Sequence, residues 1–314
     1  MRFSVTHPMA SGHYHPELAT GAGIATLARA AEAADVDGYG FTDHPAPSQR
    51  WLDSGGHDAL DPFVAMSFVA AVTTTIRLIP NIVVLPYRNP FVVAKACATL
   101  DVLSGGRFTL AAGVGYLRSE FAALGVDPDE RSELFDEALE VLRAVWTSDE
   151  VTFEGRHFRA RKVTARPRPL SRPHPPIWIG GNSAAARRRV AMHGDGWAPF
   201  PATAAMAGNV GTAALETPGQ LAAAVDDLRA RLVEAGRDPA SIDVTFVNPA
   251  GGNPASADFD PATHLAGLDE LAAMGVTWVQ IGLPGDGLGR AVEAVERYGE
   301  QVIAVHRSEA SGAS

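Results

Sequence analysis

Two patterns of hydrophobic and polar positions alternate along this chain. Short apolar runs, typical of strands, occur at residues 3–7, 38–42, 76–85, 107–113, 176–180, 195–200, 243–247 and 276–283. Between them, apolar residues recur every three or four positions, as on one face of a helix, at about 20–36, 62–72, 90–103, 131–146, 183–193, 218–235, 262–273 and 288–305. Eight strands in alternation with eight helices predict an α/β fold, the (β/α)8 TIM barrel with its parallel sheet.

Capping signals support the helix boundaries independently of the periodicity. Asn89 is a good N-cap, and Pro90 after it suits the first position of a helix. Thr217 and Gln220 have the spacing of a capping box, in which each side chain bonds the backbone of the other residue. These signals agree with the helices expected at 90–103 and 218–235.

Two stretches interrupt the alternation and are candidate insertions. Residues 150–176 predict a β-hairpin followed by a proline-rich extended segment. Residues 201–217 are small and without periodicity, and they follow the sixth strand, so a lid over the barrel mouth and a disordered surface loop both fit. We expect one barrel domain over 1–307 and a disordered tail over 308–314.

Composition narrows the class of protein. With 46% hydrophobic and 20% charged residues among 314, the chain resembles an ordinary soluble globular protein. A net charge of −10 argues against binding to a nucleic-acid backbone, and the single cysteine, Cys97, excludes an internal disulfide. No apolar run reaches the roughly 18 residues of a membrane span. We therefore expect a cytoplasmic protein without a nucleic-acid or membrane partner.

Polar residues follow the predicted second strand, where a barrel strand reaches the catalytic mouth. Asp43 and His44 stand at this point. A histidine here can exchange a proton near neutral pH, and a carboxylate can accept a hydrogen bond from a ligand amide. Alternatively, Asp43 caps a turn before Pro45 and His44 only packs.

The third and fourth strands also end in unusual residues. Pro80 lies inside the third strand, which predicts a bulge that pushes backbone into the mouth, or a mere irregularity of the strand. Gly113 and Gly115 flank a turn after the fourth strand. Their missing side chains would let a ligand approach the backbone closely, although an ordinary tight turn explains them too.

The fifth strand leads into a helix through four small or polar residues: Gly180, Gly181, Asn182 and Ser183. Free backbone N–H groups at a helix N-terminus, with a capping hydroxyl, predict a phosphate site. Arg187, Arg188 and Arg189 could reach a polyanionic tail, or at least two of them could form a solvated helix face.

Together these four features resemble the luciferase-like monooxygenase superfamily, in particular its branch that uses the deazaflavin coenzyme F420. The most specific stretches are 85–146, which begins "LPYRNPFVVAKACATL", and 174–197, "HPPIWIGGNSAAARRRVAMHGDGW". The resemblance implies a luciferase-like (β/α)8 barrel with insertions, a homodimer, and an isoalloxazine-type ring held in the mouth.

The resemblance also implies roles for individual residues. Asp43 would contact the polar edge of the ring, and His44 would lie near the reacting carbon as proton donor or acceptor. A non-proline cis peptide at Ile82-Val83 would back the ring. The ring or ribityl chain would be lined by Gly113, Val114 and Gly115, and the phosphate would be held by Gly180, Gly181, Asn182 and Ser183.

The choice of cofactor rests on the pair Asp43-His44, because flavin members of the superfamily more often carry a glutamate before this histidine. We therefore expect an F420-dependent oxidoreductase that transfers hydride between the deazaflavin and a small organic substrate. An enzyme dependent on flavin mononucleotide (FMN), a luciferase-like monooxygenase, is the alternative.

Two remote alternatives remain. His13 and His15 have the H-x-H spacing of a metal-dependent barrel hydrolase, but the fifth and sixth strands end without histidine, so no metal is expected. A non-catalytic flavin-binding protein is the other. We expect His13, Tyr14, His15 and Trp51 to line the substrate pocket or to occupy mobile loops.

Overall fold

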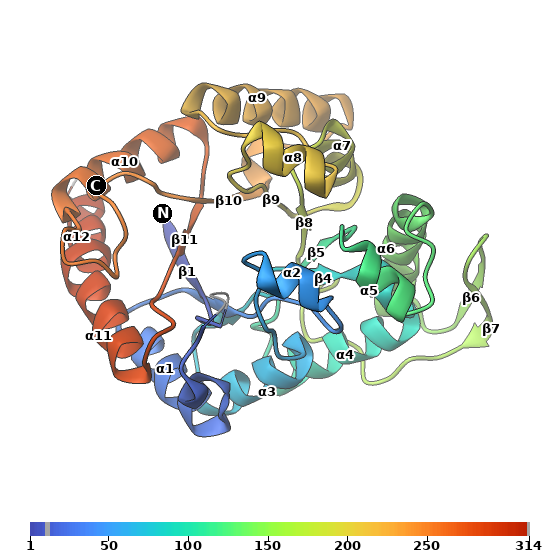
Figure 1. Cartoon of the computed structure of the whole chain (residues 1–314). Helices are drawn as coiled ribbons and strands as arrows, with labels where there is room; N and C mark the ends of the chain where they lie inside the picture. Colours follow the sequence, from blue (N-terminus) through green and yellow to red (C-terminus); the bar gives the residue numbers. More distant parts are fainter. Residues whose placement is uncertain (10–12, 313–314) are drawn as a thin grey trace.

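A barrel of parallel strands forms the centre of the computed structural model, which describes residues 1–9 and 13–312. The strands are β1 (Arg2–Thr6), β2 (Gly38–Gly40), β3 (Arg77–Leu78), β4 (Val83–Val84), β5 (Leu110–Gly113), β8 (Ile177–Gly180), β9 (Gly196–Ala198), β10 (Asp243–Val247) and β11 (Trp278–Ile281). They pair in the order β3-β2-β1-β11-β10-β9-β8-β5-β4. Because β3 and β4 are the two halves of the expected strand 76–85, this order closes on itself. A bridge between Leu78 and Phe108 also joins β3 to the residues before β5. The predicted barrel is confirmed (Figure 1).

The outer ring of helices follows the predicted segments: α1 (Gly21–Ala33), α3 (Pro62–Val72), α4 (Pro90–Leu103), α6 (Arg131–Thr147), α7 (Ala184–His193), α9 (Pro218–Glu234), α10 (Pro261–Met274) and α11 (Leu288–Tyr298). Asn89 caps α4 by accepting from the Phe91 N–H, and Thr217 and Gln220 form the predicted capping box of α9. Shorter turns complete the chain: η1 (Pro16–Ala19), α2 (Gln49–Asp53), η2 (Leu85–Tyr87), α5 (Arg118–Ala123), α8 (Ala204–Val210), η3 (Pro239–Ser241), the π-helical turn η4 (Gly299–Ile303) and α12 (Ala304–Gly312). Each helix in the described part of the chain is too short or too polar to cross a membrane.

Apolar side chains fill the barrel below its mouth. Trp178 and Trp278 meet edge to face with ring centroids 5.2 Å apart, and Ile79 and Ala111 pack with them. A Cβ on Gly196 would lie 2.2 Å from the Trp178 ring, so glycine is required there. This plug leaves the upper end of the barrel as the place for a ligand.

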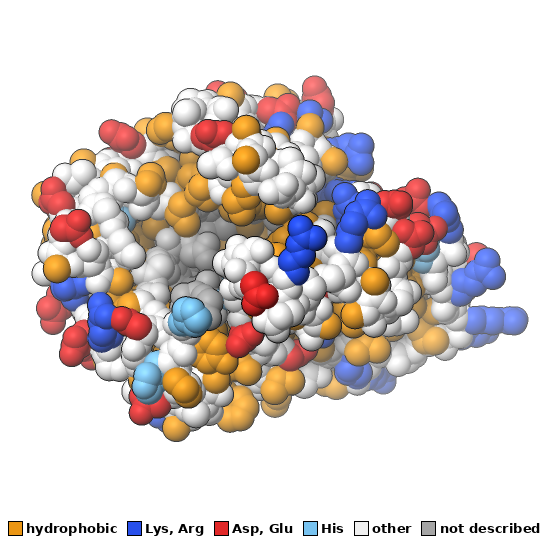
Figure 2. Space-filling view, in the orientation of Figure 1, with side chains coloured by type: hydrophobic (Ala, Val, Ile, Leu, Met, Phe, Trp, Pro, Cys, Tyr) orange, Lys and Arg blue, Asp and Glu red, His pale blue; other side chains and the backbone are white. Residues whose placement is uncertain are grey.

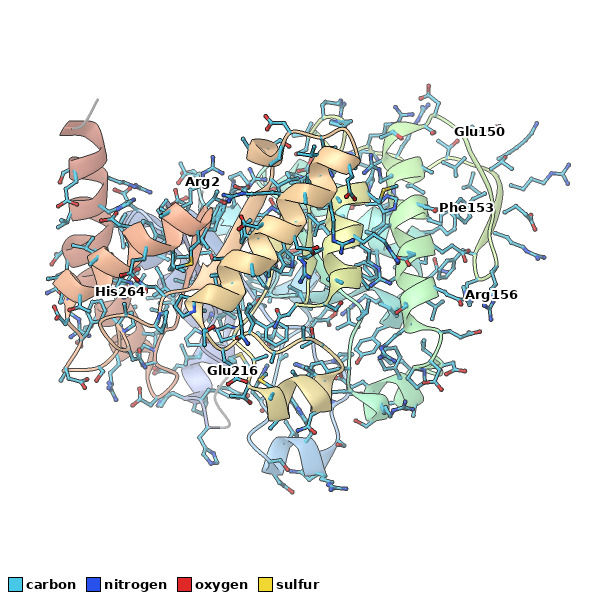
Figure 3. The ribbon with its side chains drawn as sticks, turned by 90° about the horizontal axis from the view of Figure 1, so that it is seen from above. Arg2, Glu150, Phe153, Arg156, Glu216 and His264 are labelled. Atoms are coloured by element: carbon cyan, nitrogen blue, oxygen red, sulfur yellow. The ribbon has the colours of Figure 1, made fainter. Side chains whose placement is uncertain are left out.

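The first insertion folds as expected. β6 (Val151–Glu154) and β7 (Arg159–Val163) form an antiparallel hairpin that stands beside α6 (Figures 1 and 3). The proline-rich segment that follows is held against α4 by the buried Asp101, which accepts hydrogen bonds from the Leu170 and Ser171 N–H groups.

Two predictions about irregular segments need correction. For residues 201–217 the alternative of a disordered loop is wrong, because the segment contains α8 and backbone hydrogen bonds between Ala202 and Leu215 close it into a compact unit. The lid over the mouth stays a prediction. The tail is helical as far as Gly312, so disorder over 308–312 was wrong, because α12 continues directly from η4. Residues 313 and 314 lie outside the described residues.

Candidate active site

A cavity of about 500 Å³ opens at the C-terminal ends of β1, β2, β10 and β11. Figure 2 shows the surface hollowed on this face, between the positions that α2, α8 and α10 have in Figure 1. This volume is within the range of roughly 300–1,000 Å³ that is usual for small-molecule sites. The polar side chains of its wall include Thr6, Thr42, His57, Asn81 and Gln280.

Three uncharged polar side chains form the floor of this cavity. The Thr6 hydroxyl oxygen accepts hydrogen bonds from the amide nitrogens of Asn81, at 3.1 Å, and Gln280, at 2.5 Å. The three residues come from β1, the turn between β3 and β4, and β11. Hydrogen bonding to Thr6 from both sides of β1 therefore fixes both amides.

His44 faces a buried carboxylate next to the cavity. Its Nδ1 lies 3.3 Å from Oε2 of Glu120, a residue of α5 that is fully buried. Glu120 also accepts from the Ala46 N–H, at 3.2 Å, and from the Tyr87 hydroxyl, at 3.0 Å. Because a carboxylate accepts, His44 donates from Nδ1 and keeps Nε2 as the nitrogen that can take up a proton.

Aromatic rings surround His44. The Trp51 ring, on α2, lies 4.6 Å from the His44 ring between centroids, His57 lies 5.0 Å away and Tyr116 lies 6.2 Å away. The His44 side chain is consequently only 11% exposed. Burial lowers the pKa of His57, and it raises the pKa of Tyr87, with Glu120 adding to that rise. Both groups are therefore neutral at pH 7.

Asp43 has partners within the protein. Its carboxylate is buried, accepts the Val84 N–H at 3.0 Å, and pairs with the Arg88 guanidinium at 2.7 Å. Arg88 in turn holds Asp61 at 3.0 Å. Burial raises the pKa of Asp43, and the Arg88 charge opposes that rise. The carboxylate thus fixes the backbone of β4, and its contact with a ring edge stays a prediction.

The third strand is interrupted one residue earlier than predicted. The non-proline cis peptide joins Asn81 to Ile82, whereas Ile82-Val83 was expected. The Asn81 N–H bonds the Phe41 carbonyl just after β2, and Val83 packs into the main core between barrel and helices. Ile82 is therefore the residue of this bulge that faces the mouth, and Val83 is not available to a ligand.

Glycines around the bulge make room for protein side chains. A Cβ on Gly113 would lie 2.3 Å from Cδ1 of Ile82, and a Cβ on Gly180 would lie 2.5 Å from the same atom. Gly115 has a φ of +78°, and its Cβ would meet Val84 at 2.5 Å. Glycine at position 115 is favoured by its backbone conformation, whereas a side chain at position 113 or 180 would displace the end of the Ile82 side chain. Val114, between two of them, packs partly buried against the main core.

The predicted phosphate site is partly used by the protein. The Asn182 side chain donates to the Phe200 and Ala213 carbonyls, at 2.8 and 3.0 Å, and accepts the Phe200 N–H. It therefore anchors the segment 201–217, a role that the sequence did not indicate. Gly181 adopts a φ of +105°, and Ser183 caps α7 by accepting the Ala186 N–H at 3.2 Å.

Two of the three arginines of α7 form ion pairs with neighbouring helices. Arg187 pairs with Asp227 on α9 at 2.5 Å, and Arg189 is buried in an ion pair with Asp136 on α6. Only Arg188 is exposed among the three. The alternative of a solvated face for at least two of them was therefore wrong, because two arginines tie α7 to its neighbouring helices.

The residues after β1 contribute less than expected. The Tyr14 hydroxyl bonds the Asp58 side chain, which together with burial raises the tyrosine pKa. His15 caps η1 by accepting the Glu17 N–H, and His13 is exposed. Within 1–9 and 13–312, no three His, Cys, Asp or Glu side chains come together as metal ligands would.

Sequence reasoning missed the partners of the predicted residues. Glu120 lies in the segment "GVGYLRSEF" (113–121) that begins with the turn after the fourth strand, so an acidic residue beside this turn was the available signal. No local pattern marks Gln280 or His57, which reach the site only through the closure of the barrel.

A family-wide sequence pattern described as "Luciferase-like monooxygenase" matches residues 1–250. This chain belongs to the luciferase-like monooxygenase family. The match spans the β1–β10 part of the barrel, including His44, the Asn81-Ile82 bulge and Glu120.

Individual relatives of this luciferase-like chain are similar over shorter stretches. An uncharacterized protein of Mycobacterium tuberculosis (strain ATCC 25618 / H37Rv) is 32% identical over 160 residues, 51% of this chain and 55% of that protein. An FMNH(2)-dependent dimethylsulfone monooxygenase of Pseudomonas putida is 38% identical over 120 residues, 37% of this chain and 33% of that protein. The chain spans about half the length or less of the curated relatives it matches.

Solved structures of the same fold cover almost the whole chain. Monooxygenase RslO1 from Streptomyces bottropensis superposes with a TM-score of 0.78 at 21% identity, over 98% of this chain and 100% of that one. The coenzyme F420-dependent tetrahydromethanopterin reductase from Methanopyrus kandleri gives 0.73 at 18% identity, over 97% and 99%. These likenesses show the fold.

Proposed function

We propose that this luciferase-like chain is an oxidoreductase that binds a flavin-type cofactor at the barrel mouth, with FMN as the first candidate, and acts on a small organic substrate as a monooxygenase. The observation that carries the proposal is the pair of His44 with the buried Glu120 beside the Asn81-Ile82 bulge, next to an open cavity. This arrangement puts a proton-exchanging group, an apolar ledge and a space for substrate together.

The residues present fit such a cofactor. Ile82 projects at the mouth between two glycines that leave it room, so its side chain would hold the face of a planar ring. The N–H groups of the first turn of α7, with the Ser183 hydroxyl, would hold a phosphate. Reduced FMN, when bound, supplies the chemistry of oxygen activation, and F420 would instead supply hydride.

Within the proposed site, His44 is the residue that exchanges a proton with the reacting group. Glu120 fixes the imidazole with its proton on Nδ1, so Nε2 can accept a proton from a reacting group or return it. Trp51 and Tyr116 shield the His44 imidazole from bulk water, which strengthens its hydrogen bond to Glu120. Asp43 and Arg88 position the neighbouring β4 backbone.

Two observations favour FMN over F420. The resemblance to the F420 branch implies a contact between Asp43 and the ring edge, but this carboxylate is already paired with Arg88 and the Val84 N–H. The relative with a named activity uses FMNH2. F420 is the second candidate because a full-length structural neighbour is an F420 enzyme.

Fluorescence titration of the purified protein with FMN, reduced FMN and F420 tests the proposal. We expect saturable binding of a flavin, and the variant His44→Ala should keep the cofactor affinity within about threefold while turnover falls by about 10²-fold or more. Binding of F420 alone would replace the first candidate by the second, and binding of none of them refutes both.

We also propose that two copies of the chain pair through α3. This helix carries no charged residue over its whole length, "PFVAMSFVAAV", yet Val64 is 62% and Phe68 49% exposed. A surface helix normally turns charged residues outward, so an uncharged outer face is typical of a contact surface. Exposed Val92 and Leu103 on the adjacent α4 extend it.

A further inference from the structure

The 500 Å³ cavity lies on one half of the mouth, apart from the proposed ring site. Its wall comes from the ends of β1, β2, β10 and β11, with Asn81 at the border. Ile82 in the bulge before β4, and the residues of β5, β8 and α7 that would hold the ring and the phosphate, are absent from that wall. A ring on Ile82 therefore leaves this cavity for another molecule.

No charged side chain lines this cavity among the described residues. The chain has 26 basic and 36 acidic side chains, but none of them is in the wall. Its two titratable residues are histidines. Burial lowers the pKa of His7 to about 4 and also lowers that of His57, so both are neutral at pH 7.

The floor of the cavity offers fixed hydrogen-bond donors. Each amide of Asn81 and Gln280 uses one N–H on the Thr6 hydroxyl. A primary amide has a second N–H and a carbonyl oxygen, so each side chain retains both a donor and an acceptor. Val247, which is the register partner of Gln280 on β10, and Leu283 provide apolar surface. The cavity thus combines a polar, uncharged floor with an apolar wall.

We propose, given the proposed function, that this cavity is the substrate site and takes an uncharged small molecule. A carbonyl, sulfonyl or hydroxyl oxygen of the substrate accepts a hydrogen bond from Asn81 or Gln280, and its alkyl part packs on Val247 and Leu283. An anion is rejected because no cation in the wall would compensate its loss of water.

Matched pairs of probes test this selectivity. Dimethyl sulfone and acetone are neutral, whereas methanesulfonate and acetate have similar size and carry a negative charge. Dissociation constants are measured by ligand-observed NMR, with the protein alone and with saturating FMN. We expect each neutral probe to bind at least about tenfold more tightly than its anionic counterpart, and FMN not to displace it.

Two variants of one residue locate the binding. Gln280→Met keeps the volume and removes both hydrogen-bonding groups, and Gln280→Glu adds a charge; each should weaken the neutral probes by about tenfold. Gln301→Glu, the same change at an exposed position, should leave binding unchanged. Denaturation of all three variants checks that they fold.

Clear results overturn the inference. Equal or tighter binding of the anions, displacement of the probe by FMN, unchanged affinity in both folded Gln280 variants, or no binding of any probe would each contradict it. If neither FMN nor F420 binds but the neutral probes still bind selectively, the proposed function is refuted, whereas the inferred preference of the cavity for uncharged molecules is retained.

Discussion

The substitution Gly113→Ala tests whether glycine at the mouth is needed for packing against protein side chains or for close approach of a ligand to the backbone. The added Cβ would lie 2.3 Å from Cδ1 of Ile82. Carbon atoms pack at about 3.5–4.0 Å, so the isoleucine would have to move by more than about 1 Å. Forcing a side chain off its rotamer or overpacking it costs about 1–3 kcal/mol, and the lower entropy of unfolded alanine offsets up to about 1 kcal/mol. We expect a net loss of about 1–2 kcal/mol.

A double-mutant cycle with Ile82→Val isolates the clash. Valine lacks Cδ1, the atom that Gly113→Ala would strike. In that background the alanine should be neutral or slightly stabilising, which gives a coupling energy of at least about 1 kcal/mol. Free energies of unfolding are measured by urea denaturation of the cofactor-free protein. Gly208→Ala, where no atom lies within 4 Å of the added Cβ, is the control and should stabilise slightly.

The opposite result would refute this reasoning. If Gly113→Ala lowers stability equally in both backgrounds, the clash with Ile82 is not the cause. If it leaves stability unchanged and only weakens cofactor binding, the glycine serves close approach of the ligand to the backbone.

Three further predictions concern the site, its pH dependence and the assembly. Glu120→Gln places an NH2 group against a buried hydrogen-bond donor, so the free energy of unfolding should fall by about 1–3 kcal/mol and turnover should also fall. The control is Glu150→Gln at an exposed position, which should change the free energy of unfolding by less than about 0.5 kcal/mol. Burial lowers the pKa of His7 from 6.5 to about 4, so the unfolded state binds more protons than the folded state between these pH values. The free energy of unfolding should therefore fall by up to about 3 kcal/mol as the pH drops from 6.5 to 4. A free energy of unfolding that does not change over this pH range would contradict the prediction. Phe68→Glu should convert a dimer to a monomer in analytical ultracentrifugation, and an unchanged mass would exclude α3 as the interface.

The architecture of this protein could be predicted from its sequence because periodicity and capping are local signals. Asn89 and Thr217 start their helices as expected, and the hairpin within 150–176 is present. The failures occur where tertiary contacts decide. The segment 201–217 gains its order from hydrogen bonds to Asn182, which no helical or strand pattern reveals.

The sequence located several residues of the site at the barrel mouth, but it did not indicate which side chains they contact. His44 and Glu120 are 76 residues apart, so their contact arises only when the ends of β2 and β5 meet at the mouth. Asp43 was assigned to a ligand because its partner Arg88, 45 residues away, could not be read from the sequence. The cis peptide fell one residue from its predicted place because a resemblance does not fix the register of a bulge.

A crystal structure with bound FMN tests the central claim most directly. The account predicts the ring over Ile82 with His44 beside it, and an empty cavity between Thr6, Asn81 and Gln280. A ring bound inside that cavity, away from Ile82 and His44, would contradict the account.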